Sequence, residues 1–150
     1  EKLREVAGGN PRIHFHDPVK PFELPATLNA YDVGVFWIPP THTNARLTLP
    51  NKLFDFVQAR LAVAIGPTVE MVNVVNEYGL GVVSEDFSVP SIVAALQSLT
   101  PQAITSYKQA AAAAADPLSF ESQSKVIDEI LDTFLKTPPI AGSKGATHGD

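Results

Sequence analysis

An amide, an ammonium group and a carboxylate stand close together near residue 51, where the pattern predicts the start of a helix. Asn51 and Asp55 are four residues apart, and Lys52 and Asp55 are three apart. On a helix this spacing points all three side chains toward one side, while the apolar residues between them can face the core. The sequence therefore predicts a polar face at a helix N-terminus, suited to a polar ligand.

Lys52 falls in the first helical turn, where the helix dipole disfavours a cation by ~0.3–1 kcal/mol. A bound anion would compensate this cost, and the backbone N–H groups of the turn, with Lys52 and Asn51, could cradle a phosphate. Asp55 could then accept hydrogen bonds from ribose hydroxyls. The structural alternatives are a solvated lysine beside an ordinary turn, and a role for Asp55 as the intrahelical partner of Lys52.

The residues around this helix start carry no acid. From Val33 to Phe54 there is no Asp or Glu, whereas His42, Arg46 and Lys52 are present. The formal net charge of the chain is −5, which argues against a general nucleic-acid binder, because such proteins usually meet phosphates with a basic patch. The local charge therefore favours a single bound phosphate group over a nucleic-acid surface.

Two further features allow a ligand role beside a structural one. His14 and His16 face the same way on an expected strand and have the spacing of metal ligands, but no third ligand is evident and we expect no metal site. Residues 17–19 form either a simple turn or a shelf for a flat base, through Pro18 and Val19.

Strands and helices alternate along the chain, which predicts an α/β fold: a Rossmann-like parallel sheet with helices on both faces. The expected elements are the end of a helix at 1–8, strands at 12–16, 32–38, 61–65 and 80–83, and helices at 22–30, 50–60, 68–78, 89–99, 101–115 and 119–136. Thr68 is expected as the N-cap of the helix that reaches Tyr78, and Gly79 as its stop. Because a doubly wound sheet normally begins with a strand, we expect this one to lack its first strand. Ligands bind beyond the carboxyl ends of such strands, so the loops to consider are 16–21, 39–50, 66–68 and 84–88.

The chain has 150 residues, of which 45% are hydrophobic and 18% charged, as is typical of one globular domain. We expect that domain at residues 1–137 and a disordered tail rich in Gly, Ser and Thr at 138–150. Cysteine is absent, so neither a disulfide framework nor a thiolate metal site is available. The sequence holds no apolar run of membrane-span length and no signal-peptide pattern, and we expect a cytoplasmic protein.

Five stretches follow one another in a specific order and spacing. They are IHFHDPV at 13–19, LPATLNAYDVGV at 24–35, PNKLFDF at 50–56, AVAIG at 62–66 and GLGVV at 79–83. Together they resemble the C-terminal domain of GT-B-fold glycosyltransferases, of the retaining group that builds capsular and cell-wall polysaccharides. The resemblance covers most of the chain, to about residue 136.

The resemblance implies a hexosyltransferase-type enzyme in which this domain binds a UDP- or GDP-activated sugar, with no metal or other cofactor. The diphosphate would meet the helix start at Asn51 and Lys52, and Asp55 would hold the ribose. The donor-binding residues would also include Pro18, Val19 and Leu49. Lys52 and the helix dipole would then neutralise charge that builds on the departing diphosphate.

The resemblance also implies parts outside this chain. The acceptor-binding N-terminal domain and the catalytic base would lie elsewhere, so this fragment would be inactive alone. The acceptor would be a polysaccharide or cell-envelope component. The full enzyme would have no nucleic-acid partner, and peripheral association with a membrane is compatible with this role.

The sequence departs from the commonest family pattern, in which two glutamates stand eight residues apart around this helix. Here the second is Asp55 and the first is Leu47, which leaves the donor sugar open. Glu70 either contacts that sugar or complements a helix N-terminus. One rival interpretation is a non-catalytic nucleotide-binding or interaction module. The other is a dinucleotide-dependent oxidoreductase or epimerase, which needs a Gly-x-Gly-x-x-Gly turn that this sequence lacks.

Overall fold

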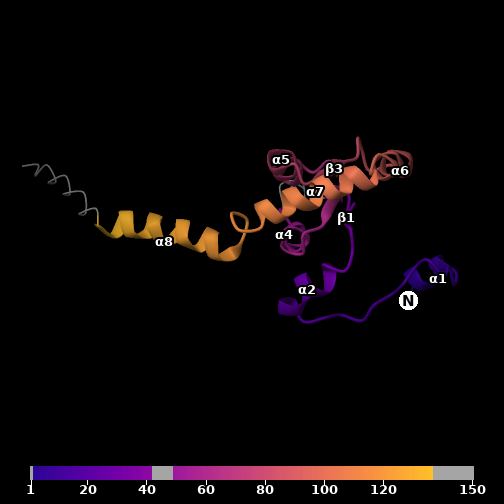
Figure 1. Ribbon diagram of the computed structural model, residues 1–150, viewed down its shortest axis with the longest axis horizontal. Helices are drawn as coiled ribbons and strands as arrows, with labels where there is room; N and C mark the ends of the chain where they lie inside the picture. The colour runs from indigo at the N-terminus through magenta and orange to yellow at the C-terminus, as the bar shows by residue number, and fades with distance from the viewer. Residues whose placement is uncertain (1, 42–48, 137–150) are drawn as a thin grey trace, which may run out of the picture.

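The computed structural model describes residues 2–41 and 49–136 of the chain. Three parallel strands form one sheet in the order β1-β2-β3. They are β1 (Val33–Phe36), β2 (Ala62–Ile65) and β3 (Gly81–Val83). Helices surround this sheet (Figure 1). The α/β, Rossmann-like architecture expected from the sequence is therefore confirmed.

Helix α4 (Asn51–Gln58) lies between β1 and β2 in the chain, and α5 (Val69–Tyr78) lies between β2 and β3. Each pair of neighbouring parallel strands is therefore joined by a crossover that contains a helix. The helical elements are α1 (Lys2–Ala7), the 3-10 turn η1 (Pro21–Glu23), α2 (Leu24–Leu28), α4 (Asn51–Gln58), α5 (Val69–Tyr78), α6 (Val89–Gln97), α7 (Pro101–Ala114) and α8 (Phe120–Lys136). This βαβαβ order sets the carboxyl ends of all three strands at one edge of the sheet.

The central strand, β2, is buried along its whole length, as expected of a parallel strand covered on both faces. Val63 pairs with Gly34 on one side and with Gly81 on the other. A Cβ atom at Gly34 would clash with the Phe56 ring, and one at Gly81 would clash with the carbonyl oxygen of Val63. The two glycines therefore allow α4 and β3 to approach their neighbours closely.

The core is built from apolar side chains of α4, β2, α5 and α7. Its largest buried members are Leu53, Phe56, Val57, Leu61, Val63, Ile65, Met71, Val75 and Leu80. Helix α7 crosses this region between α4 and α5 in Figure 1, and it contacts both helices as well as β2. The buried residues of α7 are Ala111 and Ala114, whose small side chains permit this close packing.

Helix α8 leaves the core and extends away from it (Figure 1). Ile127, Ile130 and Leu131 are each at least half exposed. Within the described part of the chain, no helix combines the length and the apolar character needed to cross a membrane.

Several helix boundaries follow ordinary capping chemistry. Gly79 ends α5 with a φ of 63°, a left-handed conformation that costs glycine little. The Ser88 hydroxyl accepts a hydrogen bond from the Ser91 N–H at the start of α6, and the Thr100 hydroxyl accepts one from Ala103 at the start of α7. The expected stop at Gly79 is confirmed.

The strand expected at 12–16 is wrong. Residues 12–16 are exposed and belong to no strand, and their backbone hydrogen bonds are local: the N–H groups of Ile13 and Arg12 donate to the carbonyl and side-chain oxygens of Asn10. Alternating apolar and polar residues make a strand only where a neighbouring strand pairs with them. No other strand in the described ranges pairs with this segment.

Two boundary predictions and one capping interaction also need correction. The helix expected at 22–30 is η1 followed by α2, which ends at Leu28 because the chain must turn into β1. Pro50 is the N-cap of α4, with extended φ and ψ of −74° and 141°, and not its first helical residue. Thr68 occupies the N-cap position of α5, but its side chain makes no capping hydrogen bond. The tail predicted to be disordered, 138–150, lies outside the described residues.

Candidate functional site

The first turn of α4 presents two polar side chains to solvent. Asn51 and Lys52 are exposed, whereas Leu53 is buried in the core. Among the described residues no side chain caps this helix, because its N-cap residue, Pro50, has no side-chain acceptor. The first backbone N–H groups of α4 therefore have no partner within the helix and are available to an anion.

Lys52 and Asp55 line the same cavity, which we call the Lys52 cavity. Its volume is about 280 Å³. Its other walls are the backbone and side chains of β1, Phe56 and Leu61, and three residues from the region of α2: Leu24, Leu28 and Tyr31. The cavity thus lies where the polar face of α4 meets β1 and α2.

Lys52 and Asp55, the charged residues of α4, have no side-chain partner among the described residues. Within the part of the chain that the structure describes, Lys52 forms no ion pair or side-chain hydrogen bond, and neither does Asp55. The alternative in which these two residues pair within the helix is therefore not seen. Asp55 is half-buried while Lys52 is exposed, so the ammonium group reaches further into solvent than the carboxylate.

Pro18 and Val19 line a second cavity, the Pro18 cavity, with a volume of about 710 Å³. Leu24, Leu28 and Tyr31 line this cavity as well as the Lys52 cavity. The two cavities therefore share a wall formed by α2 and Tyr31. Of the predicted site residues, Lys52 and Asp55 line one of these cavities, and Pro18 and Val19 line the other.

Asn51 and Leu49 are placed differently. Asn51 lines a third cavity of about 460 Å³ on the other side of Asp55, together with Phe54, Gln58 and the segment 118–120. Leu49 is half-buried and packs against the core, so it lines neither the Lys52 cavity nor the Pro18 cavity. Lys52 and Asp55 thus line one cavity, and Asn51 and Asp55 line another. The three residues do not share a single cavity, although the sequence predicted that they face one side.

In the described part of the chain, the two histidines of the Pro18 cavity do not belong to a metal-binding group of side chains. His14 and His16 both line the cavity, but the described residues hold no group of three or more His, Cys, Asp or Glu side chains placed to bind a metal ion. His16 Nε2 instead lies 3.2 Å from the Tyr31 hydroxyl, with the two rings edge to face. His16 therefore positions Tyr31 in the wall that both cavities share.

Sequence reasoning missed a hydrogen-bonded link at the carboxyl edge of the sheet. Trp37, which follows β1, donates its indole N–H to the hydroxyl of Ser84, which follows β3, at 2.9 Å. Ser84 is 2% exposed, and its hydroxyl donates in turn to the carbonyl oxygen of Asp86 at 2.8 Å. The link fixes the end of β1 against the end of β3. The sequence carried no clear signal for this link, because Trp37 falls within the strand expected at 32–38.

Two acidic residues near this edge have local roles. The Asp86 carboxylate accepts a hydrogen bond from the Ser88 N–H at 2.7 Å, and the hydrogen bonds from Ser88 lower the pKa of Asp86. Glu70 lies in the first turn of α5, where it complements the helix dipole. The adjacent Thr68 hydroxyl is buried and has no hydrogen-bond partner among the described residues.

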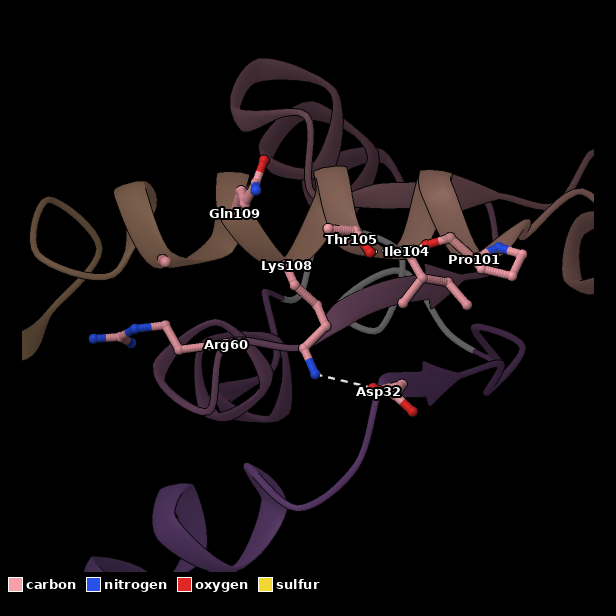
Figure 2. A pocket seen from close by; sticks show the side chains of 8 residues that line it. Asp32, Arg60, Pro101, Ile104, Thr105, Lys108 and Gln109 are labelled. Carbon is pink, nitrogen blue, oxygen red and sulfur yellow. Dashed lines mark hydrogen bonds and ion pairs between the residues drawn. The ribbon is translucent and has the colours of Figure 1, made fainter.

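A further cavity, of about 630 Å³, opens at the opposite edge of the sheet, where β1 begins (Figure 2). Figure 2 shows Lys108 reaching from α7 to Asp32, and their charged groups are 3.0 Å apart. Arg60 donates to the carbonyl oxygens of Gln58 and Val57 at the C-terminus of α4. Both cations are thus already satisfied by the protein, so this cavity is a poorer candidate for an anion than the Lys52 cavity.

The loop before α4 carries further sequence predictions that cannot be placed. His42, Arg46 and Leu47 lie outside the described residues.

Comparison of the chain with family models, curated proteins and solved structures finds no match.

Proposed function

We propose that the chain is the donor-binding domain of a glycosyltransferase and binds a nucleotide-diphosphate sugar. The observation that carries the proposal is the common wall of the Lys52 and Pro18 cavities, formed by Leu24, Leu28 and Tyr31. One of the two cavities holds an ammonium group and a carboxylate, and the other holds an apolar surface. A nucleotide likewise joins a charged diphosphate and a ribose to a flat base.

Lys52 is the group that meets the diphosphate. Its ammonium has no partner in the described part of the chain, and the uncapped N–H groups of α4 lie in the same turn. Together they would stabilise the negative charge that grows on the diphosphate as the bond to the sugar breaks. This is leaving-group stabilisation by a preformed site, and it needs no metal ion.

Asp55 is the group that holds the ribose. It lies one helical turn after Lys52 on the same cavity, and a carboxylate accepts hydrogen bonds from two vicinal hydroxyls. Pro18 and Val19 then offer an apolar surface to the face of the base. The sugar acceptor, a polysaccharide or cell-envelope component, and the groups that activate it are assigned to a separate N-terminal domain.

The test is calorimetry of UDP and GDP binding to the intact protein. Lys52→Ala should weaken binding of the nucleotide diphosphate by roughly 1–3 kcal/mol, the range for a hydrogen bond to a charged group. Lys20→Ala is the matched control, because Lys20 is exposed and lines neither cavity. Equal affinity of wild type and Lys52→Ala for both nucleotides would overturn the proposal. Binding without sugar transfer in the intact protein would favour a non-catalytic nucleotide-binding module.

A further inference from the structure

The Pro18 cavity is large enough to take a purine base and has apolar walls. At about 710 Å³ it is larger than the neighbouring Lys52 cavity, and its apolar surface comes from Pro18, Val19, Leu24 and Leu28. Ligand sites are mostly apolar with a few polar groups that fix orientation. The polar groups therefore decide which base fits.

Arg12 and Asp17 supply two of those polar groups. Both line the Pro18 cavity, and within the described ranges neither side chain forms an ion pair or hydrogen bond. Arginine only donates hydrogen bonds and an ionised aspartate only accepts them. The cavity thus combines an unused fork of donors with an unused pair of acceptors.

Among the common bases, guanine matches this combination best. Its O6 and N7 atoms are adjacent acceptors that an arginine binds in a bidentate way, and its N1–H and N2–H groups are adjacent donors that suit a carboxylate. Uracil has one N–H between two carbonyl oxygens, which a carboxylate meets less well. Adenine places an amino donor beside N7 and lacks O6, so it cannot accept twice from an arginine.

We propose that the Pro18 cavity selects guanine, with Arg12 on the O6 and N7 side and Asp17 on the N1 and N2 side. This inference rests on the proposed function and specifies it: the donor is a GDP-sugar. Tyr31, held by His16 at 3.2 Å, stands between the base and the ribose because it lines both cavities. It acts as a positioning residue at that junction.

The experiment measures GDP, UDP, ADP and xanthosine diphosphate binding to the intact protein by calorimetry. Xanthine carries a carbonyl where guanine carries its N2 amino group, so an amide at position 17 can donate to it. Asp17→Asn should weaken GDP by about 5- to 100-fold, the range for one base contact, and should strengthen xanthosine diphosphate. Asp116→Asn is the matched control, since Asp116 is exposed and lies on neither cavity.

We expect wild type to bind GDP more tightly than UDP or ADP, and Asp17→Asn to reverse the order of GDP and xanthosine diphosphate. A structural role for Asp17 would change the affinity of all nucleotides together. Nucleotide binding that depends on Lys52 but shows no preference for GDP, or no reversal in Asp17→Asn, would overturn the guanine assignment and leave the proposed function standing. Failure of every nucleotide to bind would overturn both.

Discussion

Asp55 is the central residue of the proposed nucleotide site. It borders the Lys52 cavity on one side and the cavity that contains Asn51 on the other. It is half-buried and has no ion-pair partner in the described part of the chain. A carboxylate in this position keeps its full capacity to accept hydrogen bonds from a ligand.

If Asp55 holds the ribose, its effect should depend on the ribose hydroxyls. Asp55→Asn should weaken UDP or GDP by roughly 1–3 kcal/mol, as expected for the loss of charge-assisted hydrogen bonds. The same change should matter much less for the 2′,3′-dideoxy nucleotide, which lacks the hydroxyls. Titration of both ligands against both proteins forms a double-mutant cycle. Equal losses of binding free energy for the two ligands would mean that Asp55 stabilises the fold and does not bind the ribose.

For single residues, the sequence indicated which side chains could bind a ligand, but not which side chains lie next to one another in the fold. The spacing of Lys52 and Asp55 correctly predicted that they face the same side. It could not separate Asn51, which turns to a different cavity because the segment 118–120 packs beside α4. That segment is distant in the chain, so helical periodicity alone carries no information about it.

The link between Trp37 and Ser84 is the main tie between elements at the carboxyl edge of the sheet. It joins the residue after β1 to the residue after β3 across the end of β2. The Ser84 hydroxyl both accepts from the indole and donates to the Asp86 carbonyl. Its position is therefore fixed from two sides.

Removing the Ser84 hydroxyl should loosen this edge. Ser84→Ala leaves the Trp37 N–H without its partner, which should lower the free energy of unfolding by about 1–3 kcal/mol. Because the chain has one tryptophan, a red shift of its fluorescence would report the greater exposure of the indole. Ser98→Ala is the control, since Ser98 bonds only within α6 and is exposed. Denaturant unfolding curves that coincide for wild type and Ser84→Ala would contradict this role.

The elements show what a single sequence can and cannot reveal. Buried strands such as 61–65 and caps such as Gly79 were predictable, because continuous apolar runs and left-handed glycines act locally. Residues 12–16 alternate like a strand yet pair with nothing in the described ranges. Pairing is a property of two segments, and the sequence of one of them does not determine it.

At the scale of the whole molecule, the candidate site is a product of tertiary packing. Pro18 and Val19 are more than thirty residues from Lys52 in the sequence, and the cavities that they line share Leu24 and Leu28 of α2 as a wall. Sequence reasoning named both groups of residues but did not anticipate this wall. It also missed the cavity between Asp32 and Lys108 at the other edge of the sheet.

The most direct test of the proposed site is a crystal structure of the intact protein soaked with GDP and UDP. The proposal predicts electron density for the diphosphate at Lys52, for the ribose at Asp55 and for the base against Pro18 and Val19. Soaking the Lys52→Ala variant under the same conditions controls for adventitious binding. Nucleotide density in the cavity between Asp32 and Lys108 would contradict the proposal. So would the absence of density from both the Lys52 cavity and the Pro18 cavity at saturating ligand.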